Sequence, residues 1–302
     1  EDTMAEAGRK ILLADFVQML EREEGSRVGE EIEHVHQMRV ATRRMRSAFR
    51  LLSEYYKPGP TRPYIKGLRQ IARRLGKIRD LDVMIDDLQQ YQAKQAPGLE
   101  HVFDSIIERL DKRRRRARKK LNRFLDGPEY QTFIQQYAQF LTKPGKGARS
   151  QDADGVVPYQ VRHVLPMLIH QHLAAVRAYD TVIDNQDQLT LHALRIEFKR
   201  LRYAITYFTD VLGSSAGEYI SDIKKMQDYL GRLNDAYVAV NRLRALLDEE
   251  DLTEEQTTLI NVYIEQLETE QTQRITDFPE VWQQFNTRTV QTRLANALLV
   301  LR

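Results

Sequence analysis

The stretch HQMRVATRRMRSAFRLL, from His36 to Leu52, combines one histidine, a series of cations and regularly spaced apolar residues. The same pattern returns 156 residues later as HALRIEFKRLRYAITYF, from His192 to Phe208. At about 100° per residue of a helix, the histidine and most cations of the first stretch fall within a stripe roughly 80° wide. Each stretch therefore predicts an amphipathic helix whose polar side carries a histidine and a row of cations.

The two rows correspond residue by residue, and each has an apolar side opposite the cations. The first row consists of His36, Arg39, Arg43, Arg46 and Arg50, and the second of His192, Arg195, Lys199 and Arg202. The apolar sides consist of Met38, Met45, Phe49 and Leu52 in the first helix and of Leu194, Phe198, Leu201, Ile205 and Phe208 in the second. We expect these apolar sides to be buried in the protein core.

Two further matches at nearly the same offset indicate an internal duplication of about 150 residues. LGKIRD at 75–80 returns as LGRLND at 230–235, and DGPE at 126–129 returns as DFPE at 277–280. Helical periodicity dominates, and alternating strand patterns bounded by hairpin turns are absent. The sequence thus predicts an all-α fold, with two four-helix-type bundles related by a pseudo-twofold axis.

The domain limits follow from a change in composition between the two halves. Residues 143–158 (KPGKGARSQDADGVVP) are rich in Gly, Pro and charge, and predict a linker between halves at 1–142 and 159–302.

Helix starts are marked by prolines and capping patterns. We expect the third helix to start near Thr61, with Pro63 in its first turn, and the last helix to start at Pro279. Ser215 and Thr253 each precede an acidic or amide residue by three positions, which predicts two capping boxes.

Composition limits the class of protein. With 302 residues, 42% hydrophobic and 29% charged, the chain is typical of a folded protein with two compact parts. The absence of Cys excludes disulfides and thiolate metal sites, and apolar runs are far too short to span a membrane. We found no signal peptide and expect a cytoplasmic protein.

Positive charge is concentrated in the first half. Residues 31–125 contain 24 Lys and Arg against 11 Asp and Glu, whereas residues 156–302 contain 15 against 20. The third and fourth predicted helices add two cation rows: Arg62, Lys66, Arg69, Arg73 and Lys77, and Arg109, Lys112, Arg113, Arg116, Lys120 and Arg123. Because like charges at i,i+4 repel, such rows do not serve helix stability, and they favour a polyanionic partner over simple solvated faces.

The residue types that are absent from the cation rows indicate which class of polyanion the rows would bind. Arg donates two parallel hydrogen bonds to phosphate oxygens, and a helical row spaces its cations roughly 5 to 6 Å apart. Proteins that bind nucleic acids place aromatic or amide side chains among their cations, and these rows hold almost none. A polyanion without bases therefore fits better, and nucleic acid remains the alternative partner.

The two histidine stretches, together with LGKIRDLDV and LGRLNDAYV, resemble the signature motifs of the CHAD domain, the conserved histidine α-helical domain. This resemblance covers nearly the whole chain. It implies an all-helical, pseudo-twofold pair of bundles that binds inorganic polyphosphate in a basic groove, without catalysis and without a cofactor. Many relatives are fused to a triphosphate tunnel hydrolase domain, of which this sequence shows no trace. An association with polyphosphate granules would follow.

The resemblance and the cation rows together assign seventeen residues to polyphosphate binding. They are His36, Arg39, Arg43, Arg46, Arg50, Arg69, Arg73, Lys77, Arg113, Arg116, Lys120, His192, Arg195, Lys199, Arg202, Lys224 and Arg232. The symmetry is imperfect, because Arg73 corresponds to Asp228 and Arg79 to Asn234. We expect a groove that is more basic on the N-terminal side.

Other functions are less favoured by the sequence. The histidines are followed by cations, which repel metals, and His163 and His170 lack carboxylates at ligand spacing. Asp80 and Asp82 could hold Mg²⁺ for phosphoryl transfer, although such residues more often pair with Arg, and no phosphate-binding loop or nucleophile motif is present. We therefore expect no enzyme, no metal and no membrane partner; a protein scaffold with a Glu-rich C-terminal helix is a further alternative.

Overall fold

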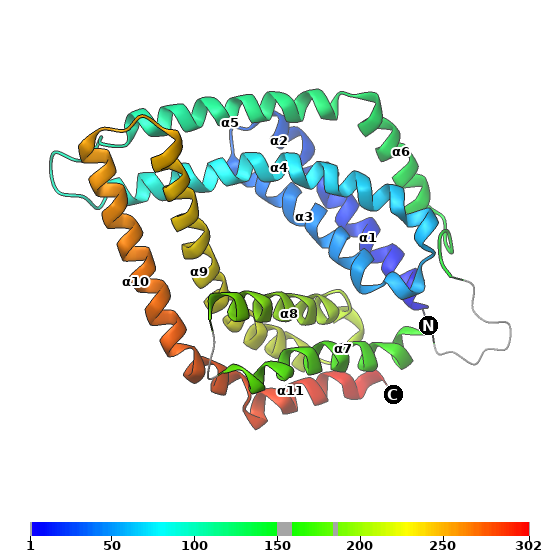
Figure 1. Cartoon of the computed structure of the whole chain (residues 1–302). Helices are drawn as coiled ribbons and strands as arrows, with labels where there is room; N and C mark the ends of the chain where they lie inside the picture. The colour runs from blue at the N-terminus through cyan, green and yellow to red at the C-terminus, as the bar shows by residue number, and fades with distance from the viewer. Residues whose placement is uncertain (1, 150–158, 184–186, 302) are drawn as a thin grey trace. The chain divides into compact units, whose positions relative to one another are not determined.

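The computed structural model describes residues 2–149, 159–183 and 187–301, and these fold into α-helices joined by turns and short 3₁₀ segments. Outside the helices, the described residues form only two isolated antiparallel bridges. The predicted all-α class is therefore confirmed. The chain divides into two compact units, Glu1–Val161 and Arg162–Arg302 (Figure 1).

Unit 1 is a bundle in which α3 packs between α1 and α4, and α4 packs between α3 and α5. A short helix, α2, lies against α3, and α6 closes the bundle against α1, α4 and α5 (Figure 1). Its helices are α1 (Met4–Glu21), α2 (Glu23–Val28), α3 (Ile32–Leu51), α4 (Pro58–Gln92), α5 (Asp104–Leu125) and α6 (Pro128–Thr142).

Unit 2 is organised around its longest helix, which packs against three others. Its helices are α7 (Val161–Arg177), α8 (Gln188–Thr206), α9 (Ser215–Glu249), α10 (Glu254–Phe285) and α11 (Arg288–Leu298). The central helix α9 contacts α8, α10 and α11 closely, and α7 has Leu165, Ile169 and Val176 completely buried. The predicted duplication stays a prediction, although α4 and α9 both contain 35 residues.

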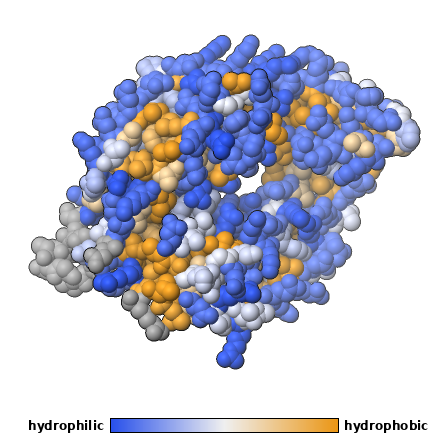
Figure 2. Space-filling model, turned by 180° about the vertical axis from the view of Figure 1, so that it is seen from behind, coloured by the Kyte–Doolittle hydropathy of each residue, from blue (hydrophilic) through white to orange (hydrophobic). Residues whose placement is uncertain are grey.

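The apolar sides of the two histidine helices form part of the cores, as predicted. On α3, Met38 and Met45 are completely buried, and on α8 Leu194, Phe198 and Leu201 are completely buried. The remaining predicted core residues of both stretches are buried as well: Phe49, Leu52, Ile205 and Phe208. Burying these faces leaves the cation rows on the outside of the bundles. Hydrophilic side chains accordingly cover most of the face in Figure 2, with apolar side chains gathered in separate patches.

Aromatic side chains fill the core of unit 1. The ring of Tyr137 on α6 is 5.0 Å from those of Phe16 and Tyr64, and Tyr64 is 4.7 Å from Phe140. In unit 2, Trp282 is 3% exposed and its Nε1 donates a hydrogen bond of 2.6 Å to Asp180 Oδ1.

Two proline positions differ from prediction. The helix α4 begins at Pro58, so Pro63 lies inside the helix rather than in its first turn. The reason is that Pro58 and Pro60 occupy the first turn, where a backbone N–H has no helical partner to lose. The predicted start of the last helix at Pro279 was wrong, because α10 continues through Pro279 and the last helix begins at Arg288.

The matched landmarks DGPE and DFPE therefore have different structures. In unit 1, Gly127 is extended (φ −74°, ψ 151°) and separates α5 from α6. In unit 2, the residue before the proline is Phe278, which is fully buried and packs beside Trp282 with 6.2 Å between ring centroids. Because both rings are anchored in the core, the helix stays continuous past Pro279.

The two predicted capping boxes also differ in outcome. Thr253 forms the complete reciprocal box with Gln256 and is confirmed. The box at Ser215 was wrong: the preceding residue, Ser214, is already helical and makes no side-chain cap. The backbone N–H of Ala216 bonds to the Gly213 carbonyl at 2.9 Å instead, so the first turn does not need a serine cap.

The predicted linker falls partly on residues 150–158, which lie outside the described residues. On one side, Lys57 N–H bonds to the Gly147 carbonyl at 2.8 Å and Arg149 N–H bonds to the Tyr55 carbonyl at 3.0 Å. On the other side, Met4 N–H bonds to the Tyr159 carbonyl at 2.9 Å. The described chain on both sides of the gap is thus held on unit 1.

Candidate functional site

The cation rows of α3 and α4 meet in unit 1 around one cavity of about 310 Å³. Its lining consists of Arg39, Arg43 and Arg46 from α3 and of Arg69, Ala72 and Arg73 from α4. Within the part of the chain that the structure describes, this lining contains five guanidinium groups and no acidic side chain. The structure therefore brings together five of the seventeen predicted site residues.

The orientation of α3 is fixed by a buried ion pair on its other side. Arg44 follows Arg43 in the sequence but faces α1, where its Nε donates a hydrogen bond of 2.7 Å to Asp15 Oδ1. Asp15 is only 1% exposed. Burial raises the pKa of the Asp15 carboxyl, and the charge and hydrogen bond of Arg44 oppose that rise. This contact sets the rotation of α3 and hence the direction of its cation row.

The cavity concentrates positive charge in a partly buried place. Burial lowers the pKa of the Arg46 guanidinium, and the charges of Arg69, Arg50 and Arg39 lower it further. Both causes act against the charged form, so the isolated protein holds these cations at an energetic cost. A bound anion would remove the repulsion between them.

His36 lies at the edge of this cluster and faces α4. Its pKa is lowered by burial first and then by the charge of Arg79, with smaller effects of Arg43 and Arg39. The Nδ1 of His36 and the Nε of Arg43 are buried without a hydrogen-bond partner among the described residues. Arg79 is a site residue that the sequence-based assignment missed, because it lies outside the stripe of cations predicted for α4.

The cations of α5 are not part of the cavity lining. Arg113, Arg116 and Lys120 are exposed on the surface of α5. The half-buried arginines of the same helix have structural partners: Arg114 contacts the buried Asp82 at 3.2 Å, and Arg118 lies directly over Gly29. The predicted site residues of α5 therefore form an exposed basic surface outside the cavity.

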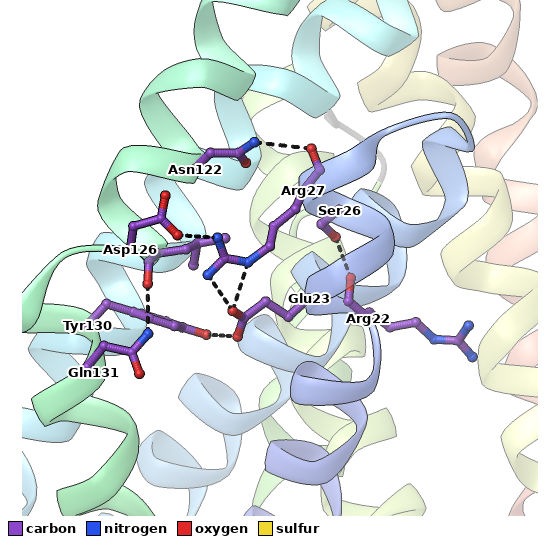
Figure 3. Close-up of polar contacts among 9 residues, drawn as sticks. Arg22, Glu23, Ser26, Arg27, Asn122, Asp126, Tyr130 and Gln131 are labelled. Atoms are coloured by element: carbon purple, nitrogen blue, oxygen red, sulfur yellow. Dashed lines mark hydrogen bonds and ion pairs between the residues drawn. The ribbon is translucent and has the colours of Figure 1, made fainter.

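A polar cluster fixes the end of α5 against α2 and α6 (Figure 3). Arg27 pairs with Glu23 at 2.8 Å and with Asp126 at 2.6 Å, and Asn122 donates to the Arg27 carbonyl at 3.2 Å. The Tyr130 hydroxyl donates to the other carboxylate oxygen of Glu23. Burial and this hydrogen bond raise the pKa of Tyr130 well above its usual value. Glu23 and Asp126 are paired with Arg27, and so they do not neutralise the positive charge of the cavity between α3 and α4.

In unit 2, the corresponding helices pair in the same register but with less positive charge. His192 Nδ1 lies 2.8 Å from Asn234 Oδ1, where unit 1 places Arg79 against His36. Lys224 and Arg232 are exposed on α9, and Asp228 lies between them on that helix. Arg195, Lys199 and Arg202 on α8 are half-buried.

A family model described as "CHAD domain" matches residues 10–244 of the chain. The chain belongs to the CHAD family. The resemblance seen in the histidine stretches is therefore confirmed over most of the sequence, including both histidine helices.

Relatives of this CHAD protein include two uncharacterized proteins of Mycobacterium tuberculosis, one from strain CDC 1551 and one from strain H37Rv. Both are 29% identical over 210 residues, or 69% of this chain. The matched part spans 39% of the length of those relatives.

Two solved structures share the fold. The crystal structure of the CHAD domain from the plant Ricinus communis has a TM-score of 0.66 at 20% identity, and covers 100% of this chain and 93% of its own. PptA from Streptomyces chartreusis has a TM-score of 0.69 at 11% identity, and covers 94% and 100%, respectively. At these identities the likeness concerns the CHAD fold alone.

Among the described residues of this CHAD protein, no three or more His, Cys, Asp or Glu side chains gather in a group that could hold a metal ion. No helix in the described ranges has the length and apolar character needed to cross a membrane.

Proposed function

We propose that this CHAD protein binds inorganic polyphosphate, without catalysis, and that the cavity between α3 and α4 is its main binding site. The observation that carries the proposal is the lining of that cavity, in which five arginines from two helices meet and which, within the described ranges, includes no acidic side chain. Arginine is suited to phosphate because its planar fork donates two parallel hydrogen bonds to two oxygens. A cytoplasmic location, in association with polyphosphate granules, belongs to the same proposal.

The chemistry of the lining favours a polyanion without bases. Single-stranded nucleic acids are held by aromatic side chains that stack on bases, and base edges are read by amide and charged side chains. Of the described residues that line the cavity, all are arginines except Ala72. Such a surface can bind phosphate oxygens but offers a base neither a ring to stack on nor an amide.

Repulsion between the cations in the free protein also favours polyphosphate as the ligand. The pKa values of Arg46 and His36 are both lowered by burial and by neighbouring arginines, so this region disfavours positive charge until an anion binds. Each phosphate that enters lowers the positive potential around His36 and thereby favours its protonation. His36 would then donate a charge-assisted hydrogen bond.

We assign unit 2 a smaller contribution to polyphosphate binding. The same two helices are present there, but Asp228 and Asn234 stand where unit 1 has Arg73 and Arg79. An Asp on the binding face repels phosphate, so we infer weaker binding by α8 and α9.

The test is binding of fluorescently labelled long-chain polyphosphate at about 0.15 M salt, with tRNA and duplex DNA as competitors at equal phosphate. The double variant Arg43→Gln with Arg46→Gln removes two cavity cations. Because charge-assisted hydrogen bonds contribute about 1.5 to 3 kcal/mol each, we expect at least a hundredfold weaker binding. The matched control, Arg22→Gln with Lys94→Gln, removes two exposed cations of the same unit and should change affinity by less than about threefold.

Each outcome separates the alternatives. Unchanged affinity in a folded cavity variant would exclude this site. Displacement of polyphosphate by tRNA or DNA at equal phosphate would favour nucleic-acid binding through the same basic faces. Release of inorganic phosphate during the incubation would contradict the non-catalytic part of the proposal.

A further inference from the structure

Unit 2 contains a second cavity, of about 450 Å³, which the proposed function does not use. It lies between α7, the start of α9 and α11, and most of its lining is apolar. Pro166 and Leu173 come from α7, and Val290 and Leu294 come from α11. Leu299, which also lines it, is 48% exposed, so the cavity opens to solvent.

The wall that α11 contributes to the cavity has no aromatic ring. The sequence of α11, RTVQTRLANAL, contains no aromatic residue. The apolar side chains that α11 does contribute, such as Val290 and Leu294, line the cavity and leave its space open.

Five polar residues among those described line the cavity, and besides Asn286 and Gln291 they include two that are cationic or can become so. Arg177 and His170 come from α7, and Tyr219 comes from the start of α9. Tyr219 is 1% exposed and lines the same cavity as Arg177. Burial raises the pKa of Tyr219; the charge of Arg177 opposes this rise, and that of Asp222 adds to it.

No acidic side chain lines this cavity among the described residues. The Arg177 guanidinium and the Tyr219 hydroxyl can both donate hydrogen bonds to a single anionic group. Apart from His170, Asn286 and Gln291, the remaining lining is apolar. The site is therefore amphipathic, with hydrogen-bond donors beside a mainly apolar wall.

We propose that this cavity binds a single-chain amphiphile with an anionic head group, of the fatty-acid type. The carboxylate would meet Arg177 and the Tyr219 hydroxyl, and the acyl chain would lie between α7 and α11. The volume falls within the range of small-molecule sites, about 300 to 1,000 Å³.

The experiment is calorimetric titration of the full chain with octanoate, decanoate and dodecanoate below their micelle concentrations. Each CH₂ that becomes buried should tighten binding about fourfold, since its burial is worth about 0.8 kcal/mol. Decanol, which has the decanoate chain length without the charge, should bind at least about tenfold more weakly. Phosphatidylcholine vesicles containing phosphatidylglycerol test a membrane surface as the source of the amphiphile.

Four variants test whether decanoate binds in the cavity of unit 2. Arg177→Gln should weaken decanoate at least about tenfold and Tyr219→Phe several-fold, whereas Ala295→Phe should abolish binding by filling the cavity. Arg162→Gln removes an exposed cation from the same helix outside the lining and should have no effect. Polyphosphate binding should be unchanged in all four variants, because the other site lies in unit 1.

The proposal is overturned if folded Arg177→Gln and Tyr219→Phe bind decanoate as tightly as the unchanged protein, or if decanol binds equally well. It is also overturned if light scattering shows a dimer that Ala295→Phe dissociates, because a second copy would then be the occupant. Binding to vesicles but not to free decanoate would likewise exclude a single-chain site.

Discussion

Arg43 and Arg44 are neighbours in the sequence but differ in role. Arg43 lines the cavity of unit 1, whereas Arg44 forms the buried pair with Asp15 that holds α3 against α1. The helical period separates them, because adjacent residues point about 100° apart. The sequence stripe included Arg43, which lines the cavity, and left Arg44 out. It could not name Asp15, which comes from another helix.

Loss of Arg44 should destabilise the protein in a pH-dependent way. The Arg44→Met variant leaves Asp15 buried without its cation, and we expect the free energy of unfolding at pH 7 to fall by about 3 kcal/mol. The folded pKa of Asp15 is already raised by burial and would rise further, so the penalty is present above that pKa and disappears as the pH falls through it. Urea unfolding at pH 7 and pH 5 should therefore show a smaller loss at pH 5, with Arg50→Met as the control. An equal loss at both pH values would contradict the assigned cause.

His36 should make polyphosphate binding depend on pH. Its folded pKa is lowered by burial and by Arg79, with Arg43 and Arg39 adding to the effect and Glu33 opposing it. Because bound phosphate raises that pKa, binding takes up a proton and should strengthen as the pH falls from 8 to 5.5, by up to about tenfold.

The control for this pH dependence is a second histidine of the same unit. His36→Gln should flatten the affinity profile, while His101→Gln, at a position 86% exposed and paired with Asp104, should leave it unchanged. A profile that stays equally steep in His36→Gln would assign the proton to another group.

At the scale of elements, the C-cap of α2 is Gly29, where substitution by any residue with a side chain should destabilise the fold. Gly29 has a φ of +72°, and a Cβ there would lie 2.0 Å from Cζ of Arg118. Only glycine combines this backbone conformation with the close approach of α5.

Two glycine substitutions should consequently have opposite signs. Gly29→Ala should lower the free energy of unfolding by about 1 to 2 kcal/mol, through backbone strain and displacement of Arg118. Gly231→Ala, inside α9 where a Cβ meets nothing within 4 Å, should raise it by about 1 kcal/mol. Chemical denaturation of both variants measures the two effects. Destabilisation by Gly231→Ala would contradict the open surroundings found there.

The elements themselves were largely predictable, because period and composition determine them locally. The buried faces of α3 and α8 follow from spacing alone. The start of the last helix could not be predicted from spacing, since the path of the chain at Pro279 depends on Phe278 and Trp282 packing into a core. Arg79 was missed for a similar reason: its role depends on the side from which α3 approaches α4, and one sequence does not show this.

At the scale of the whole molecule, the two units should respond unequally to polyphosphate. Hydrogen–deuterium exchange of the full chain should show stronger protection of α3 and α4 than of α8 and α9 at saturating ligand, because only unit 1 has Arg73 and Arg79. Substituting Asp228→Arg with Asn234→Arg should bring the protection of α8 and α9 closer to that of α3 and α4. Equal protection of both pairs in the unchanged protein would contradict an unequal division of binding.

The fold class and the family could be predicted from the sequence, whereas the cavity of unit 2 could not. Its walls come from α7, α9 and α11, which are distant in sequence, and its open space results from side chains that are absent. The lack of aromatic residues between Arg288 and Leu298 is visible in the sequence. It acquires meaning only once the last helix is known to begin at Arg288 and to line the cavity.

The burial of Trp282 has a practical consequence, because it is the single tryptophan of the chain. Its indole is enclosed by Phe198, Phe278 and Phe285, so its emission reports on unit 2 while unit 1 unfolds without changing it. Circular dichroism, in contrast, sums the helices of both units. Superimposable denaturation curves from the two signals would mean one cooperative transition, and separated curves would mean two. The protein thus carries an intrinsic optical label that distinguishes one half from the other.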